Sequence, residues 1–324
     1  MEQRGLGRSG VSVSRIVLGC GNFGGVGSAP AFFGQGIEHD EALRIMDTAW
    51  ELGITTFDTA DAYGGGTSEL WIGEWIAAKG PLVRDAIVVE TKTFNPVAEG
   101  ADRGLSPTRI HRQIDASLER LGLERVALYF AHDFDLDVPQ EETLQAFDDL
   151  VQVGKIGATG ASNFSAEQLS EAIELSELAG LTRYEVVQNS FSLLDSGDAE
   201  TMFPVCREQG LGYEAFGPLA GGWLTGKYRR GAVYPAGSRM TQRPESYLRY
   251  ATDEMFDALE AFQREAAQRG VSMAGLALTW LLATPEVTAV VVGPTRAEHL
   301  EPVREALALA LAPAERDHLR GLFG

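Results

Sequence analysis

The chain has 324 residues, 44% of them hydrophobic, so it is long enough to form one large barrel or two smaller domains. Its 46 acidic residues exceed its 27 basic residues, giving a formal net charge of −19. Such a surface repels phosphate backbones and anionic lipids, which makes nucleic acid and membranes poor candidate partners. The N-terminus, MEQRGLGRSG, lacks the apolar segment of a signal peptide, and the two cysteines suit a reducing compartment. We therefore expect a cytoplasmic protein.

Short apolar runs alternate with amphipathic segments along the whole chain. Residues 3–14 predict a β-hairpin. Helix start signals follow at Asp40, at Ser106 with Pro107, and at Ser165. Eight runs have the compact apolar character of parallel strands that are covered on both faces. They are residues 15–19, 55–58, 86–92, 126–132, 156–162, 185–188, 212–216 and 288–293.

This alternation predicts an α/β fold, a closed (β/α)8 TIM barrel. No linker or change of composition interrupts it, so we expect residues 1–324 to form one domain. A long loop rich in glycine, proline and arginine follows the seventh strand over residues 218–250, and an extra C-terminal helix starts at Pro313. A loop of that length in a compact domain is usually functional or mobile.

Two glycine-rich segments match nucleotide-binding patterns without their context. GCGNFG, residues 19–24, fits the G-x-G-x-x-G fingerprint, but that fingerprint must open a helix directly. Here Pro30 and several glycines precede the next helix, so we reject a Rossmann fold and expect a loop above the barrel mouth. GGWLTGK, residues 221–227, resembles a Walker loop, but Tyr228 replaces the Ser or Thr that binds Mg²⁺.

Four polar residues stand where a barrel enzyme has its active site, at the C-terminal ends of the strands. Asp58, Lys92 and His132 end the second, third and fourth predicted strands, and Tyr63 lies in the loop after the second. Neighbouring strands are about 4.8 Å apart, so these ends fall within about 10 Å of one another. Any one of the four could be structural, but together they indicate a catalytic site.

The four side chains suit the reduction of a carbonyl group. Hydride addition leaves negative charge on the oxygen, which needs a proton donor and a positive field. Tyr63 is the candidate donor; we expect Lys92 to lower the pKa of its phenol, and Asp58 to hold the ammonium in position. His132 can orient the carbonyl through a hydrogen bond.

A set of segments distributed along the chain carries a family resemblance. They are RGLGRSGVSVSRIVLGCGNFGG, GITTFDTADAYGGGTSE, VVETKT, LYFAHDFD, VGKIGATGASNF, VVQNSFSLL, YEAFGPLAGGWLTGKY and VVVGPTRAEHLE. Through them the chain resembles the bacterial aldo-keto reductases over nearly its whole length. The resemblance implies an oxidoreductase that takes hydride from a nicotinamide cofactor, usually NADPH, and uses Asp58, Tyr63, Lys92 and His132 to convert an aldehyde or ketone reversibly to an alcohol, without a metal.

The resemblance also implies which residues bind the cofactor. Gly21, Asn22, Phe23 and Asp58 would lie beside it, Ser162, Asn163 and Gln188 would hold the carboxamide, and Phe216 would stack on the nicotinamide. Gly217, Pro218, Leu219, Gly222, Leu224 and Lys227 would line the pyrophosphate, and Gly293, Thr295, Arg296 and His299 the adenosine phosphate end.

The segment after the eighth strand departs from the family pattern. Relatives often carry Arg, Gln and Asn where this chain has Thr295, His299 and Val303, while Arg296 is displaced by one residue. NADPH is favoured because Arg296 can still reach a phosphate, and NADH is the alternative.

The substrate pocket is harder to predict. Candidate walls are Phe23, Phe33, Tyr63, Phe94, His132, Phe134 and Trp223. Asp133 is a hypothetical partner for a hydroxyl of a sugar-like substrate, although a solvated loop acid is the simpler interpretation.

Other functions stay open on the same site. They are a cofactor-sensing interaction subunit with little turnover and an NAD-dependent sugar or alcohol dehydrogenase. A metal-assisted isomerase or hydrolase ranks low, because of five histidines only His132 ends a predicted catalytic strand. The physiological substrate, the preferred direction and the oligomeric state are not predicted.

Overall fold

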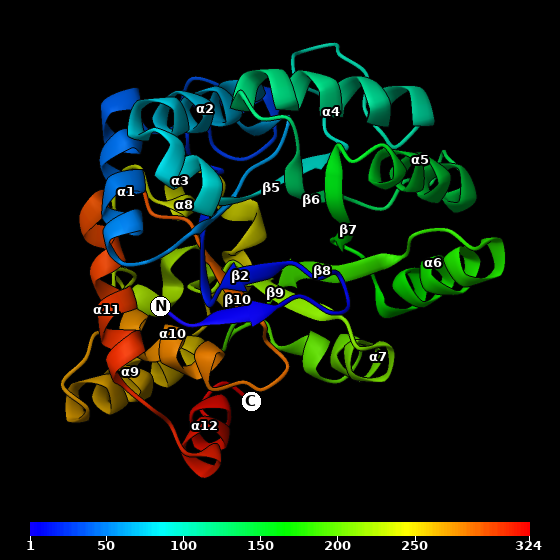
Figure 1. Cartoon of the computed structure of the whole chain (residues 1–324). Coiled ribbons are helices and arrows are strands. Elements are labelled where there is room, and N and C mark those ends of the chain that lie inside the picture. Colours follow the sequence, from blue (N-terminus) through cyan, green and yellow to red (C-terminus); the bar gives the residue numbers. More distant parts are fainter.

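The computed structural model describes residues 1–324, and eight parallel strands in it close into a barrel (Figure 1). Each strand pairs with the next along the chain, and β10 closes the ring by pairing with both β3 and β9. The barrel strands are β3 (Ile16–Gly19), β4 (Thr56–Asp58), β5 (Val88–Thr93), β6 (Val126–Ala131), β7 (Ile156–Ser162), β8 (Tyr184–Ser190), β9 (Gly212–Phe216) and β10 (Ala289–Val292).

Helices surround the barrel and follow its strands. They are α1 (His39–Glu51), α2 (Thr67–Lys79), α3 (Pro81–Ala86), α4 (Pro107–Leu121), α5 (Gln140–Gln152), α6 (Ala166–Ala179), α7 (Met202–Gln209), α8 (Arg239–Gln242), α9 (Asp253–Gln268), α10 (Met273–Leu282), α11 (Glu301–Ala308) and α12 (Pro313–Arg320). None of them is both long enough and apolar enough to cross a membrane.

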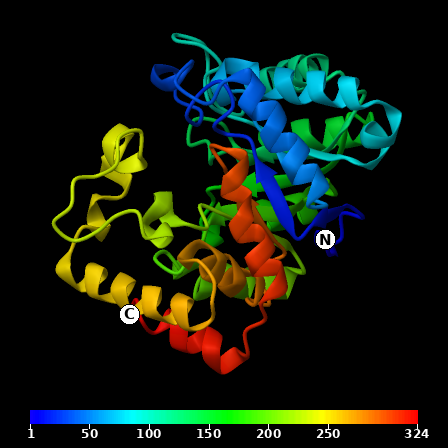
Figure 2. The same ribbon diagram turned by 90° about the vertical axis from the view of Figure 1, so that its left-hand side faces the viewer.

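The features predicted outside the eightfold repeat are present. β1 (Gln3–Gly5) and β2 (Ser12–Ser14) pair antiparallel, so the predicted hairpin is confirmed. The long loop after β9 includes α8 and short 3₁₀ turns, and Figure 2 shows it in yellow on the side of the molecule opposite the N-terminus. The C-terminal helix α12 starts at Pro313 as predicted.

The barrel interior has an apolar floor. Val17 of β3 belongs to a small buried cluster that also contains Leu6 and Val13 of the hairpin region, whereas its neighbours Ile16 and Leu18 join the large core between strands and helices. This alternation follows from the opposite orientation of successive strand side chains. Apolar side chains therefore fill the barrel on the side of the hairpin, at the opposite end from the polar residues of the C-terminal strand ends.

Two of the three predicted helix starts are confirmed. Pro107 is the first residue of α4, and Ser165 caps α6 in a capping box with Gln168. The predicted cap at Asp40 is wrong by two residues, because α1 begins at His39 and its N-cap is Glu38, which provides no side-chain cap. Acidic side chains in a first turn stabilise a helix through its dipole, so Asp40 still favours α1 from inside it.

Replacing Ser165 by alanine is expected to lower the free energy of unfolding by about 1 kcal/mol, because the Ser165 hydroxyl accepts a hydrogen bond from the Gln168 amide at the start of α6. Chemical denaturation measures the change. Ser106→Ala is the matched control, since Ser106 precedes α4 without a side-chain capping bond and its replacement should cost less. Equal losses in both variants would contradict the capping argument.

Candidate active site

The structure brings the four predicted catalytic residues together at the C-terminal end of the barrel. The Lys92 ammonium donates a hydrogen bond to the Asp58 carboxylate and a second one to the Thr59 carbonyl at 3.0 Å. Its Nζ lies 3.5 Å from the Tyr63 hydroxyl. Lys92 is fully buried, so these three oxygens account for its side-chain contacts with polar groups. The lysine thus links the carboxylate to the phenol.

Tyr63 is placed by a short 3₁₀ turn, Tyr63–Gly66, immediately after β4. Its ring lies against the backbone of Gly21, where an added Cβ would be only 3.4 Å from the ring. The opposite neighbour is His132, whose ring meets the tyrosine edge-on at a centroid distance of 5.5 Å. Tyr63 is half-buried, so this packing fixes the ring while leaving part of it accessible.

His132 follows β6 directly and has a defined tautomer in this environment. Burial and the nearby Lys92 charge lower the pKa of His132 well below its usual value, so the imidazole is neutral at pH 7. Its Nδ1 faces the side-chain nitrogen of Asn95 at 3.4 Å. An amide nitrogen only donates, so Nδ1 accepts and the imidazole proton is on Nε2. His132 can therefore donate from Nε2 to a substrate oxygen, and Asn95 is a supporting residue that the sequence did not reveal.

The expected lowering of the tyrosine pKa is wrong for this structure. Burial raises the pKa of Tyr63, and the opposing effect of Lys92 does not outweigh it. Burial alone would lower the pKa of Lys92, but the Asp58 carboxylate and Tyr63 raise it above its ordinary value. At neutral pH the site therefore holds a protonated phenol beside an ammonium ion.

The residues expected to hold a carboxamide converge on this site. Gln188 is buried, and its Nε2 donates to Asp58 Oδ1 at 2.9 Å and to Glu214 Oε2 at 3.0 Å. Asn163 donates from Nδ2 to the His132 carbonyl at 2.8 Å and to the Ser162 hydroxyl at 3.2 Å. Asn163 has a positive φ of 60°, a conformation that asparagine tolerates better than most residues.

The loop after β9 begins with a short glycine-containing turn. A 3₁₀ turn covers Ala220–Thr225, and no helix starts there, which agrees with the rejection of a Walker loop. Gly222 has a φ of 97°, and a Cβ on it would overlap the Lys227 side chain at 2.2 Å. Gly222 is therefore required for Lys227 to lie across this backbone.

Positive charge gathers beside this loop although the chain is strongly acidic. Burial lowers the pKa of Lys227 and Arg239 lowers it further. Arg239 was not anticipated from the sequence; its guanidinium reaches back from α8 to Asn22 Oδ1 at 2.8 Å. Burial, Arg296 and Lys227 together lower the pKa of His299, which lies 3.1 Å from Arg296. Arg239, Arg296 and Lys227 contact polar or aromatic groups in place of carboxylates. Together these three cations form a suitable site for phosphate groups.

Several predicted pocket walls are not on an accessible surface. Phe23 and Trp223, two of the predicted pocket walls, are fully buried in the large apolar core. Trp223 packs among aromatic rings that include Tyr228 and Phe256. Phe94 is mostly buried, with 9% of its surface exposed. Asp133 is exposed, and its Oδ1 accepts a hydrogen bond from the Phe134 backbone amide at 2.9 Å.

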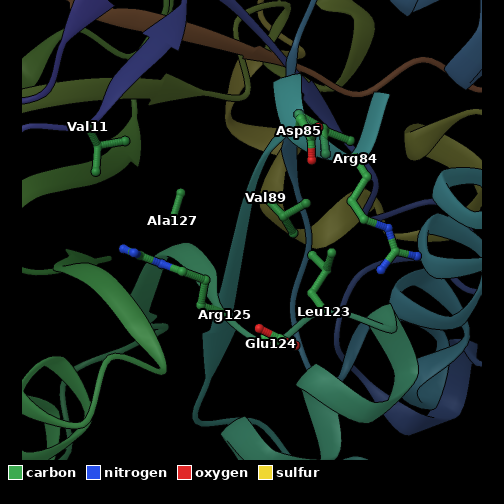
Figure 3. Close-up of a pocket in the computed structure, with 9 residues that line it drawn as sticks. Val11, Arg84, Asp85, Val89, Leu123, Glu124, Arg125 and Ala127 are labelled. Carbon is green, nitrogen blue, oxygen red and sulfur yellow. The ribbon is translucent and has the colours of Figure 1, made fainter. Parts of the chain in front are cut away.

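A separate hollow lies at the opposite end of the strands (Figure 3). It is lined by residues that precede or begin β5 and β6, among them Arg84, Val89 and Arg125, together with Val11 of the hairpin region. None of the four predicted catalytic residues lines it. This hollow is therefore distinct from the site at the C-terminal strand ends.

The fold and the site define a barrel oxidoreductase, and comparison with known proteins agrees. The model of the aldo/keto reductase family matches residues 15–322. The chain is 35% identical to L-glyceraldehyde 3-phosphate reductase of Escherichia coli (strain K12), with 95% of this chain and 88% of the relative covered. It is 31% identical to a probable voltage-gated potassium channel subunit beta of Arabidopsis thaliana, with 93% and 89% covered. It is 30% identical to the NADH-specific methylglyoxal reductase of Escherichia coli (strain K12), with 99% and 98% covered.

The chain belongs to the aldo/keto reductase family. The predicted family and the predicted barrel are thus confirmed, and the protein is an oxidoreductase that uses a nicotinamide cofactor.

Proposed function

We propose that this protein reduces small aldehydes or ketones with NADPH, reversibly, and that Tyr63 donates the proton. The observation that carries the proposal is the buried Lys92, which joins the Asp58 carboxylate to the Tyr63 phenol beside a neutral His132. The carbonyl oxygen becomes negatively charged when hydride is added, and it then requires a proton donor next to a fixed cation.

The proposed mechanism assigns one task to each side chain. His132 Nε2 donates a hydrogen bond that orients the carbonyl oxygen towards the Tyr63 hydroxyl. When bound, the nicotinamide supplies the hydride. Tyr63 gives its proton to the oxygen, and Lys92, kept cationic by Asp58, stabilises the phenolate that results. In the reverse direction the phenolate accepts the proton of the alcohol.

The residues present fit a nicotinamide dinucleotide. Gln188 has its amide nitrogen committed to two carboxylates, so its oxygen is the atom available to a carboxamide N–H. We propose that Lys227 and Arg239 bind the pyrophosphate over the Gly217–Lys227 backbone, with Phe216 beside the nicotinamide. Phe216 is half-buried at the end of β9, as a stacking surface must be. We propose that Arg296 and His299, which are exposed and in contact with each other, hold the adenosine phosphate end.

NADPH preference is proposed to depend on Arg296. Arg296→Ala is expected to raise the dissociation constant of NADPH on the order of tenfold, because a charge-assisted hydrogen bond to the 2′-phosphate is lost, and to leave that of NADH unchanged. Fluorescence titration with both cofactors measures this. Arg304→Ala is the control, since Arg304 pairs with Glu301 on the adjoining α11 and should affect neither cofactor. Parallel weakening of NADPH and NADH by Arg296→Ala would contradict the assignment.

A cofactor-sensing subunit is the second candidate, because one similar protein is named as a channel subunit. The two functions differ in turnover. Purified protein is titrated with NADPH and NADH, and cofactor oxidation is then followed with a panel that includes glyceraldehyde 3-phosphate and methylglyoxal, the compounds in the names of two relatives. Multiple turnovers with any member support the reductase, whereas tight cofactor binding without turnover across the panel supports the sensor.

A further inference from the structure

Two glutamates occupy the interior of the barrel below the proposed catalytic residues. Glu90 of β5 and Glu214 of β9 are both fully buried. In the sheet register Glu90 lies opposite Asp58, and Glu214 lies opposite Gln188. Interior barrel positions of this kind usually carry branched apolar side chains. Two carboxyl groups there are costly, so they call for a physical explanation.

Of the two glutamates, only Glu214 is hydrogen-bonded to the proposed site. Gln188 Nε2 bridges Glu214 Oε2 and Asp58 Oδ1. Both oxygens of Glu90 and Oε1 of Glu214 receive no donor from other groups. The three carboxyl groups also do not form a set that could hold a metal ion. The side chains of Glu90 and Glu214 lie within hydrogen-bonding reach of each other, so a proton shared between them would satisfy these oxygens.

Charge balance requires a proton in this cluster. Three buried carboxyl groups, those of Asp58, Glu90 and Glu214, face a single buried cation, Lys92. Burial, and then the Glu214 charge, raise the pKa of Glu90 well above its usual value, and burial raises the pKa of Glu214 to about 7. Glu90 therefore keeps its proton at neutral pH and can donate it in a hydrogen bond to Glu214.

We propose that Glu90 and Glu214 form a proton-sharing positioning pair, in which Glu214 orients the Gln188 amide towards the cofactor and the charge of the pair makes carbonyl reduction depend on pH. The inference rests on the proposed reductase function. Glu214 holds the amide nitrogen of Gln188 towards the carboxylates, which leaves the amide oxygen for the nicotinamide carboxamide.

The direction of the pH effect follows from the groups that face the pair. These are Asp58 from β4 and Lys92 from β5, with the neutral Gln188 from β8 between. When the pair gains a negative charge as pH rises, the phenolate of Tyr63 becomes less favourable and proton donation slows. Burial raises the pKa of Tyr63 above its usual value and lowers the pKa of His132 well below its usual value, so neither group produces a step near neutrality.

The test combines the pH profile with cofactor binding. Wild-type kcat for carbonyl reduction is expected to fall as pH rises through neutrality, and Glu90→Gln/Glu214→Gln is expected to abolish this step. Asp61→Asn is the matched control. Burial also raises the pKa of Asp61 to about 7, but the Asp61 carboxylate contacts the side chains of Arg109 and Thr93 and not the Lys92 ammonium, so this variant should keep the step. A double variant with the wild-type profile would overturn the pH proposal.

Two readouts do not depend on turnover. Glu214→Leu is expected to raise the NADPH dissociation constant on the order of fivefold, and Glu214→Gln to bind nearly as the wild type, because its amide oxygen still accepts from Gln188. Equal affinities of the two variants would overturn the positioning role. Infrared spectra of the cofactor-free protein should show the carbonyl band of a protonated carboxyl above pH 7, and Glu90→Gln should remove it. Absence of that band would overturn proton sharing, whether or not the protein proves to be a reductase.

Discussion

Tyr63→Phe is expected to reduce kcat for carbonyl reduction by about 10²–10⁴-fold, the usual contribution of a general acid. The hydroxyl that lies 3.5 Å from Lys92 is the only polar atom this change removes. The phenyl ring still packs against Gly21 and meets His132, so the architecture around it is retained. Steady-state oxidation of NADPH with a saturating carbonyl compound measures the loss.

Cofactor affinity separates chemistry from binding in this variant. Tyr63→Phe should bind NADPH within about twofold of the wild type, because only one hydroxyl changes and the proposed phosphate contacts lie at Lys227 and Arg239. Turnover at the wild-type rate would show that another group donates the proton. Loss of cofactor binding in parallel with turnover would place Tyr63 in the binding surface instead.

Lys92→Met is expected to lower both activity and stability. Removal of the buried cation leaves the Asp58 carboxylate without its ion partner, which typically costs about 3–5 kcal/mol of unfolding free energy. The phenolate also loses its stabilising charge, so kcat should fall by about 10²–10³-fold. Urea denaturation and cofactor oxidation measure the two effects.

A double variant separates these two effects. In Lys92→Met/Asp58→Asn the unpaired charge at position 58 is removed together with the cation, so most of the lost stability should return. Activity should not return, because neither the cation nor its partner is restored. A single Lys92→Met variant as stable as the wild type would contradict the ion pair, and a double variant with recovered activity would contradict the role of Lys92 in catalysis.

The barrel could be predicted because every strand leaves a local signal. Each of the eight runs that were expected from apolar and β-branched content overlaps a strand of the structure, with ends that differ by up to two residues. Capping chemistry also acts locally, which is why Ser165 predicts the start of α6 well. The start of α1 was misplaced at Asp40 because an acidic residue favours both a cap and a first turn.

The site was only partly predictable. Asp58, Lys92 and His132 could be expected to meet because parallel strand ends share one edge of a barrel. The burial of Phe23 and Trp223 could not be predicted from the sequence, because an aromatic residue in a loop has the same local pattern whether it faces a pocket or the core. Arg239 and Asn95 act through contacts with residues distant in the sequence, Asn22 and His132, which no local pattern reveals.

The pKa values of the buried groups were the feature hardest to predict from the sequence. Proximity of Lys92 suggested a lowered tyrosine pKa, but burial has the larger effect on Tyr63. Likewise Glu90 and Glu214 are 124 positions apart by number and meet only when β5 and β9 close into the same barrel. Desolvation depends on the complete packing around a group and cannot be deduced from its neighbours in the chain.

The most direct test of the proposed function follows the transferred atoms. The protein is incubated with NADPH deuterated at C4 of the nicotinamide and an aldehyde that it turns over, and the alcohol is analysed by mass spectrometry and NMR. Deuterium on the carbinol carbon, formed at a rate that falls by about 10²-fold or more in Tyr63→Phe, is the predicted result. An alcohol without deuterium at that carbon, or deuterium transfer at the same rate in both proteins, would contradict the account.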